Sequence, residues 1–320
     1  MRALVTGATG FVGQYLCAEL VAHGWTVAGT THGAPVADAP DVVLRRDVRW
    51  IPADVRRADD LRVAIDASTP DAIFHLAGLT FVPSASADPG ATLEANVVAV
   101  GRLLGDVRVR RDAGALDPVV IVAGSGLQYG RHDVAEMPLP ESAEQRPADL
   151  YAASKAAQEI VALEAWRASG VRVIATRSFN HAGAGQSEQF LLPRLVRRAL
   201  EAKRAGTPGV AISLGNVEPV RDFLHVRDVV RAYVLLAGRG VPGEVYNVAS
   251  GAGKSVRELA ERVLAVVGVD AKLHSEPSLQ RRGDIPVLVG DAGKLRAVTG
   301  WSPALTLDDI LDDLLRAAPR

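Results

Sequence analysis

The sequence predicts an α/β protein with a doubly wound parallel sheet and a smaller α/β lobe in its C-terminal half. Short apolar segments rich in β-branched residues recur along the chain, and a segment of helical periodicity follows each of them. This alternation is typical of a parallel sheet that helices cover on both faces. The chain has 320 residues, of which 48% are apolar, and this length exceeds the usual size of a single core, which favours a second lobe.

Seven segments are expected to form the strands of the sheet: Ala3–Thr6, Thr26–Thr30, Val48–Ala53, Ala72–Ala77, Val119–Ala123, Arg172–Thr176 and Glu244–Val248. Helices are expected between them over about 11–23, 58–67, 90–110 and 148–168. Further helices are expected near 188–204, 226–238, 255–267 and 307–316. Gly24 is expected to follow the end of the first helix, because a residue without a Cβ accepts the left-handed conformation found there. Ser255 and Glu258 have the spacing of a capping box at the start of a later helix.

Composition and charge exclude several classes of protein. The net charge is −1 with both signs spread along the chain, so neither a nucleic-acid partner nor a membrane-binding surface is expected. Cys17 is the single cysteine, which excludes an intrachain disulfide and fits a reducing compartment. The chain opens on a strand without an apolar leader, and no uncharged apolar run approaches the roughly 18 residues of a membrane span. We therefore expect a cytoplasmic protein that is not bound to a membrane.

A glycine-rich turn joins the first expected strand to the first helix. Gly7 permits the tight turn, Gly10 lets backbone N–H groups approach a pyrophosphate, and Gly13 lets the helix pack closely against the strand. The positive end of the helix dipole faces the same anion. The turn, which also contains Thr9, Phe11 and Val12, predicts a Rossmann-type dinucleotide site. We expect the dinucleotide-binding domain to span 1–178, with 220–249 returning to it, and a substrate-binding lobe to be formed by 179–219 and 250–320.

The end of the second expected strand indicates which dinucleotide binds. An acid at this position accepts hydrogen bonds from the ribose 2′-hydroxyl of NAD, but the sequence has Thr30, Thr31 and His32 there. These side chains tolerate or bind a 2′-phosphate, so NADP(H) is favoured and NAD(H) stays possible. No arginine stands at this point to strengthen the preference.

Tyr151 and Lys155 are one helical turn apart, so they project from the same face of the expected helix. A nearby ammonium favours the phenolate, and we expect it to lower the pKa of Tyr151 toward a range useful for proton exchange with a sugar hydroxyl. Lys155 can also hold the nicotinamide ribose. Ser125 follows an apolar strand, at the sheet edge where ligands bind, and can donate a hydrogen bond to a reacting oxygen. Taken alone, the pair is also compatible with a half-buried tyrosine beside a solvated lysine.

Five features in this order resemble the extended short-chain dehydrogenase/reductase family, over essentially the whole chain. They are the glycine turn, Asp54-Val55, His75-Leu-Ala-Gly78, Ser125-x3-Tyr129-Gly130 and Tyr151-x3-Lys155. The resemblance implies a catalytic set of Ser125, Tyr151 and Lys155. It places Asp54 and Val55 at the adenine, and Leu76, Ala77, Gly78 and Thr80 along the pyrophosphate and ribose. It also implies a homodimer formed through the helices at 90–110 and 148–168.

Motifs in the second half are similar to the branch of GDP-mannose 4,6-dehydratase and GDP-6-deoxy-4-keto-mannose reductase. These are Arg177-Ser-Phe-Asn-His-Ala-Gly-Ala-Gly-Gln186, Leu214-Gly-Asn216, Val220-Arg-Asp-Phe223, Val245–Ser250, Arg281–Pro286 and Val289-Gly-Asp291. In that branch His181 would contact the nicotinamide end, Asn180 the substrate, and Arg221 with Arg281 the diphosphate, because a guanidinium fork matches phosphate oxygens. Ala184 replaces the proline usual in the glycine turn.

Position 127 separates the reactions of this family. Dehydratases carry a glutamate two positions after the catalytic Ser or Thr, and here that position is Leu127. Without a carboxylate there, removal of water across C5 and C6 is disfavoured. The resemblance then implies NADPH-dependent reduction of a nucleotide-activated 4-keto-6-deoxyhexose, with GDP-4-keto-6-deoxy-D-mannose giving GDP-D-rhamnose, and no metal site. A nucleotide-sugar 4-epimerase that retains NAD is one alternative, and a non-catalytic NADP(H)-sensing protein is another.

Overall fold

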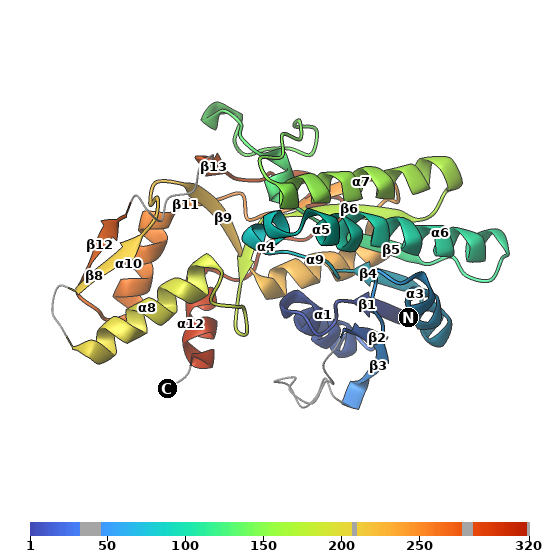
Figure 1. Ribbon diagram of the computed structural model, residues 1–320, viewed down its shortest axis with the longest axis horizontal. Coiled ribbons are helices and arrows are strands. Elements are labelled where there is room, and N and C mark those ends of the chain that lie inside the picture. Colours follow the sequence, from blue (N-terminus) through green and yellow to red (C-terminus); the bar gives the residue numbers. More distant parts are fainter. Residues whose placement is uncertain (33–45, 207–209, 277–283, 319–320) are drawn as a thin grey trace.

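A computed structural model describes residues 1–32, 46–206, 210–276 and 284–318, and Figure 1 shows a large body joined to a smaller one. Its main sheet has seven strands in the order β10-β6-β5-β4-β1-β2-β3, and every neighbouring pair is parallel. The strands are β1 (Arg2–Thr6), β2 (Thr26–Thr31), β3 (Val48–Pro52), β4 (Ala72–His75), β5 (Val119–Ser125), β6 (Val173–Ser178) and β10 (Val245–Val248). These are the seven strands that the sequence predicted, and the doubly wound fold is confirmed.

Helices cover both faces of the main sheet. The residues of β1 show why its sequence is continuously apolar: Val5 joins the core on one face and Leu4 joins the core on the other. One face is covered by α1 (Phe11–Ala22), α9 (Val226–Arg239) and α11 (Gly293–Thr299). The other face is covered by α3 (Ala58–Ser68), α6 (Ala99–Asp112) and α7 (Leu150–Ser169).

In the part of the chain that the structure describes, the smaller body contains two short sheets and three helices. One sheet pairs β7 (Asn180–Ala182), β9 (Val220–His225), β11 (Gly253–Ser255) and β13 (Val287–Leu288), and the other pairs β8 (Val210–Leu214) with β12 (Ala271–Ser275). The helices are α8 (Leu191–Ala205), α10 (Val256–Val267) and α12 (Leu307–Ala317). Their apolar side chains form a separate core, which includes Leu195, Leu259 and Leu311.

Two segments sit differently from the expected division into lobes. Residues 220–225 form β9 in the small sheet, and the chain rejoins the main body at α9 and β10. Leu288, Leu295 and Trp301 lie within the segment expected in the substrate lobe, yet their side chains join the core beneath the main sheet. The two lobes therefore share packing through the C-terminal segment.

Two helix ends that were predicted from adjacent residues are confirmed. Gly24 has φ of 75° after α1, and Ser255 with Glu258 forms the expected capping box of α10.

The long helix expected at 90–110 is interrupted: α5 (Pro89–Leu93), a π-helical turn (Glu94–Val98) and α6 follow one another. The helix α4 (Val82–Ala87) and two 3-10 turns, Gly126–Tyr129 and Val134–Glu136, were not expected.

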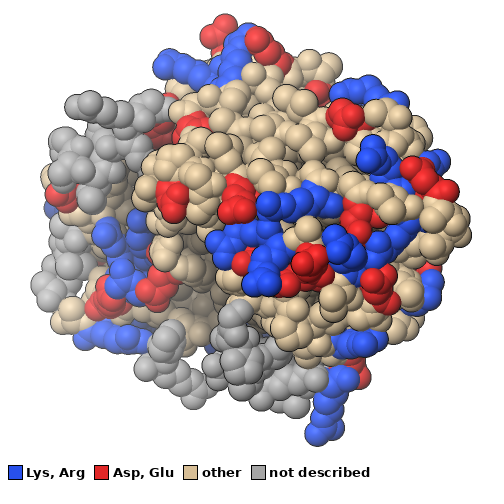
Figure 2. Space-filling model, turned by 45° about the vertical axis from the view of Figure 1, so that its right-hand side comes forward, with Lys and Arg blue, Asp and Glu red and all other residues tan. Residues whose placement is uncertain are grey.

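The surface carries charges of both signs. On the face drawn in Figure 2, basic and acidic side chains are intermingled, and no continuous basic stripe runs across that face. Within the described part of the chain, no helix combines the length and apolar character needed to span a bilayer.

Candidate active site

A cavity of about 880 Å³ lies at the carboxyl ends of the main-sheet strands and extends to the smaller lobe. Ligands bind at this edge in open α/β sheets. Most residues predicted from the sequence line the cavity: Gly7, Thr9, Gly10, Phe11, Val12, Gly13, His32, Asp54, Val55, Leu76, Ala77, Gly78, Thr80, Ser125, Tyr151, Asn180, His181 and Arg221. Thr31 and Lys155 are buried beside it, and Arg281 lies outside the described residues.

The glycine turn is formed by backbone contacts that leave no space for a side chain. A Cβ on Gly13 would lie 2.2 Å from the carbonyl oxygen of Gly7, and a Cβ on Gly7 would lie 2.8 Å from the amide nitrogen of Ala77. Gly7 also has φ of 71°. Gly10 is the N-cap of α1, so the amides of the first helical turn face the cavity without a capping side chain. This end of the cavity fits a pyrophosphate.

The end of the cavity where the adenosine is expected contains a cation that was not identified from the sequence. Arg56 contacts both carboxylate oxygens of Asp54, with Nε 3.0 Å from Oδ1 and Nη2 2.7 Å from Oδ2. These hydrogen bonds lower the pKa of Asp54 to about 2. His32 Nδ1 lies 3.9 Å from Asp54 Oδ2. Because β2 and β3 are neighbouring parallel strands, an arginine shortly after β3 lies close to the end of β2.

Tyr151 and Lys155 lie on the first turns of α7, whose N-cap is Asp149. Both side chains are buried. Lys155 Nζ donates to the carbonyl oxygen of Ala123 at 2.9 Å and to Gln158 Oε1 at 3.0 Å. Burial lowers the pKa of Lys155 to about 8.

The expected lowering of the Tyr151 pKa is wrong for this structure. Burial raises the pKa of Tyr151 to about 12, although a hydrogen bond with Ser125 opposes the shift. The cause is desolvation of the phenolate, which dominates because Lys155 directs its ammonium at Ala123 and Gln158. The phenol is therefore held protonated, which is the form that donates a proton.

Ser125 stands at the end of β5, where the chain enters the 3-10 turn. Its Oγ accepts a hydrogen bond from the Leu127 amide at 3.2 Å, and its own amide donates to Gln128 Oε1 at 2.7 Å. Because the Leu127 amide occupies an acceptor site of Oγ, the hydroxyl keeps its proton for another acceptor. The described carboxylates that line the cavity are Asp54, which pairs with Arg56, and Asp284, which pairs with Arg221. Position 127 contributes an apolar side chain.

The residues expected at the nicotinamide end come from β7. His181 Nδ1 lies 2.9 Å from the carbonyl oxygen of Phe179 and so carries the proton, and the ring stacks on Phe11 with centroids 6.2 Å apart. Burial lowers the pKa of His181, which keeps the ring neutral at pH 7. Asn180 Nδ2 donates to the Asp222 carbonyl oxygen at 3.3 Å.

The smaller lobe adds cations to the same cavity. Arg221 Nη2 is 2.7 Å from Asp284 Oδ1, so Asp284 compensates part of its charge. Arg194 and Arg198, on one face of α8, also line the cavity, and Arg198 donates to the Ser213 carbonyl oxygen. These two were not selected from the sequence, because α8 is arginine-rich and only its packing shows which arginines face the cavity.

A parallel sheet with a glycine turn at its edge, and a serine, tyrosine and lysine gathered beside it, define an extended short-chain dehydrogenase/reductase. Residues 4–314 match the family model described as GDP-mannose 4,6 dehydratase, and the chain therefore belongs to that family. Family members include nucleotide-sugar dehydratases, reductases and epimerases, so this protein is an enzyme and the sensor alternative is disfavoured.

Individual relatives agree with this assignment. The chain is 33% identical to a GDP-6-deoxy-D-mannose reductase of Pseudomonas aeruginosa, over 98% of this chain and 96% of the relative. It superposes on the structure of RMD from Pseudomonas aeruginosa complexed with NADPH with a TM-score of 0.82 and 30% identity, covering 99% and 98% of the two chains. A Thermus thermophilus UDP-glucose 4-epimerase in complex with NAD gives a TM-score of 0.84 at 26% identity, covering 99% and 100%.

Proposed function

We propose that this protein is an NADPH-dependent reductase of a nucleotide-activated 4-keto-6-deoxyhexose, converting GDP-4-keto-6-deoxy-D-mannose to GDP-D-rhamnose. The observation that carries the proposal is the full-length similarity to a GDP-6-deoxy-D-mannose reductase, at 33% identity. Leu127 supports it, because no carboxylate among the described residues that line the cavity stands beside Ser125 to eliminate water.

The site residues have complementary roles in this reduction. Bound NADPH supplies a hydride to C4 of the sugar. The Tyr151 phenol donates its proton to the C4 oxygen as the carbonyl becomes an alcohol, and the raised pKa keeps that proton in place beforehand. The Ser125 hydroxyl donates a hydrogen bond to the same oxygen and stabilises the charge that develops there. Lys155 holds the nicotinamide ribose, and its positive charge stabilises the phenolate that forms when Tyr151 has donated its proton.

Recognition of NADPH over NADH is assigned to Arg56 and His32. Both line the adenosine end of the cavity beside Asp54, and Arg56 neutralises that carboxylate. A 2′-phosphate brings about two negative charges, and a guanidinium binds phosphate oxygens well. NAD(H) lacks this group, so we propose weaker binding of NAD(H).

The 4-epimerase alternative has one observation in its favour, namely the close superposition on an NAD-bound UDP-glucose 4-epimerase. An epimerase regenerates its own NAD and retains it, whereas a reductase exchanges its nucleotide at every turnover. Denaturing the purified protein and assaying the released nucleotide distinguishes the two. Stoichiometric NAD that does not exchange with added nucleotide would favour the epimerase.

The reductase proposal is tested by turnover of defined substrates. The protein is expected to oxidise NADPH when GDP-4-keto-6-deoxy-D-mannose is added, and to yield GDP-D-rhamnose as a single product by NMR. UDP- and dTDP-linked keto sugars are expected to react at least about tenfold more slowly. Turnover confined to UDP-linked sugars would refute the GDP assignment.

We further propose that the enzyme acts in the cytoplasm as a homodimer formed by α6 and α7. These helices lie side by side in Figure 1, and they carry exposed apolar side chains: Val109 is 60% exposed and Ile160 is 61% exposed. Light scattering is expected to give twice the monomer mass. Ile160→Arg places a charge in the proposed interface and is expected to shift the measured mass toward that of the monomer.

A further inference from the structure

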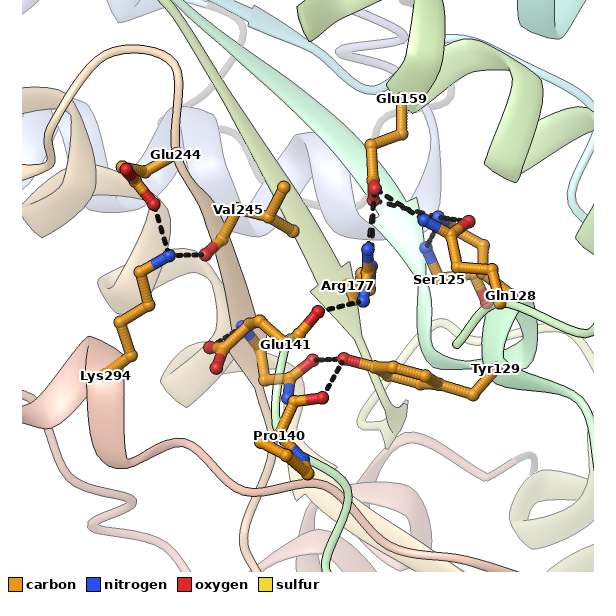
Figure 3. Close-up of polar contacts among 12 residues, drawn as sticks. Ser125, Gln128, Tyr129, Pro140, Glu141, Glu159, Arg177, Glu244, Val245 and Lys294 are labelled. Carbon is orange, nitrogen blue, oxygen red and sulfur yellow. Dashed lines mark hydrogen bonds and ion pairs between the residues drawn. The ribbon is translucent and has the colours of Figure 1, made fainter. Parts of the chain in front are cut away.

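A chain of buried hydrogen bonds connects Ser125 to a carboxylate on α7 (Figure 3). The Ser125 amide donates to Gln128 Oε1 at 2.7 Å, and Gln128 Nε2 donates to Glu159 Oε2 at 3.0 Å. Gln128 is completely buried, and Glu159 is 3% exposed. Neither residue lines the cavity, so both lie behind the side chains that do. Glu159 lies two helical turns after Tyr151 on the same helix.

Glu159 is held in position by Arg177, which donates to both of its oxygens. Arg177 Nε lies 2.9 Å from Oε2 and Arg177 Nη2 lies 2.7 Å from Oε1, which makes a bidentate pair. Gln145 Nε2 donates to Oε1 at 2.6 Å. Arg177 is itself held by the Glu141 carbonyl oxygen at 3.0 Å and lies over the Tyr129 ring, 4.8 Å from its centroid. Glu159 is therefore the carboxylate partner of a buried ion pair, with hydrogen-bond donors at both of its oxygens.

The negative charge of Glu159 decides which way the Gln128 amide points. A carboxylate accepts hydrogen bonds only, so Gln128 must turn Nε2 toward it and Oε1 toward Ser125. The flipped amide would direct an N–H at the Ser125 amide and an oxygen at the carboxylate. Both contacts would be repulsive in a buried place, where unpaired polar groups are costly.

The orientation of Gln128 in turn fixes the Ser125 hydroxyl. The bond from the Ser125 amide anchors the backbone at the end of β5, and the 3-10 turn that starts there brings the Leu127 amide to Ser125 Oγ at 3.2 Å. The strand that carries Ser125 is thereby tied to the helix that carries Tyr151 and Lys155. A reacting oxygen must meet Ser125 and Tyr151 together, and an error of about 1 Å in such a geometry costs on the order of 100-fold in rate.

We propose that Gln128, oriented by Glu159, is a positioning residue. It holds the Ser125 hydroxyl where it can contact the same substrate oxygen that receives the proton of Tyr151. This inference rests on the proposed role of Ser125 in the reduction. The buried Glu159–Arg177 pair then affects the rate of the reaction as well as packing, because it orients the side-chain amide of Gln128.

The test compares Gln128→Met with Gln145→Met in the full-length enzyme. Methionine keeps the length of glutamine but makes neither hydrogen bond. Gln128→Met is expected to lower kcat about 10- to 100-fold, while KM for the sugar nucleotide and Kd for NADPH stay within about threefold.

Gln145→Met is the matched control, because it removes hydrogen bonds to Glu159 and to Gln128 Nε2 without touching the bond at the Ser125 amide. Both Arg177 bonds to Glu159 remain, and so does the bond that orients Gln128. The kcat of this variant is expected to change less than about threefold.

A double-mutant cycle with Ser125→Ala separates positioning from a general loss of stability. If Gln128 acts through the Ser125 hydroxyl, Gln128→Met is expected to lower kcat less than about twofold in the Ser125→Ala background. Equal losses of kcat for Gln128→Met and Gln145→Met, or a full loss in the Ser125→Ala background, would overturn the proposal. An unchanged kcat in Ser125→Ala alone would overturn the assigned role of Ser125, and this inference with it.

Gln128→Glu gives an independent readout if the methionine variant does not fold. When the introduced carboxyl is protonated, it can accept from the Ser125 amide and donate to Glu159, whereas the ionised form repels Glu159. The kcat of this variant is expected to fall, relative to wild type, by at least about tenfold as pH rises through the pKa of the introduced carboxyl. A pH profile that parallels wild type would contradict the proposed orientation by charge.

Discussion

The ammonium of Lys155 donates a hydrogen bond of 2.9 Å to the carbonyl oxygen of Ala123, two residues before Ser125 on β5. Tyr151, one helical turn earlier on α7, is therefore left with Ser125 as its polar partner and is kept protonated by burial. The lysine anchors the helix to the strand, and the tyrosine stores the proton. This division of roles leads to predictions for each residue.

Tyr151→Phe is expected to lower kcat by at least about 1,000-fold, because the variant has no proton to donate to the sugar oxygen. Cofactor binding is expected to stay within about threefold, since the ring and its packing remain. Single-turnover kinetics with NADPH fluorescence measure both quantities. A variant that keeps most of its turnover would refute the role of the phenol.

The free energy of unfolding is expected to depend on pH through Lys155. Its pKa is about 8 in the folded protein against a reference value of 10.5, so between these values the unfolded chain binds more protons. The folded state carries a cost for burying the ammonium, and this cost is relieved as pH rises above about 8. The free energy of unfolding is therefore expected to rise with pH, by at most about 3 kcal/mol from this group.

Urea denaturation without nucleotide, from pH 7 to 9.5, checks this contribution against Lys155→Met. The variant lacks the titrating group and should show a smaller rise, while the tyrosines titrate in both proteins and cancel. Parallel curves for the two proteins would show that Lys155 titrates normally.

Arg56→Ala is expected to weaken NADPH binding about 10- to 100-fold, because a charge-assisted hydrogen bond to the 2′-phosphate is lost. NADH binding is expected to change less than about threefold. Arg57→Ala is the matched control, since Arg57 is the next residue, is exposed and pairs with Asp60 outside the cavity. Calorimetry with both nucleotides measures the difference, and equal losses for NADPH and NADH would contradict the assignment.

Gly13→Ala is expected to abolish nucleotide binding and to lower the free energy of unfolding by several kcal/mol. A Cβ at this position would lie 2.2 Å from the Gly7 carbonyl oxygen, which is backbone and cannot move without opening the turn. Gly238, near the end of α9, has open space around its Cβ position, and Gly238→Ala is expected to stabilise the protein by about 0.5 kcal/mol. Thermal melting of both variants tests this contrast.

The main sheet could be predicted because its information is local and repeated. The inner strands are short apolar runs buried on both faces, as Leu4 and Val5 show, and some helices carry their own capping residues, as at Ser255. The strands β7 and β13 were missed because two or three residues carry no period, and β9 was missed because partners far away in the sequence define it. The π-helical turn was missed for the same reason. Asn96 within it bonds to Leu79 and Ser154, which are distant along the chain.

The sequence by itself determined the fold class, the glycine turn and the types of residue available for chemistry, because these depend on spacing along one strand or helix. Tertiary structure decided the protonation state of Tyr151, the direction of the Lys155 ammonium and the presence of Arg56 in the cavity beside Asp54. Solvation and hydrogen-bond partners set these properties, and both come from segments that only folding brings together. The same holds for Gln128, whose orientation is imposed by a charge on another helix.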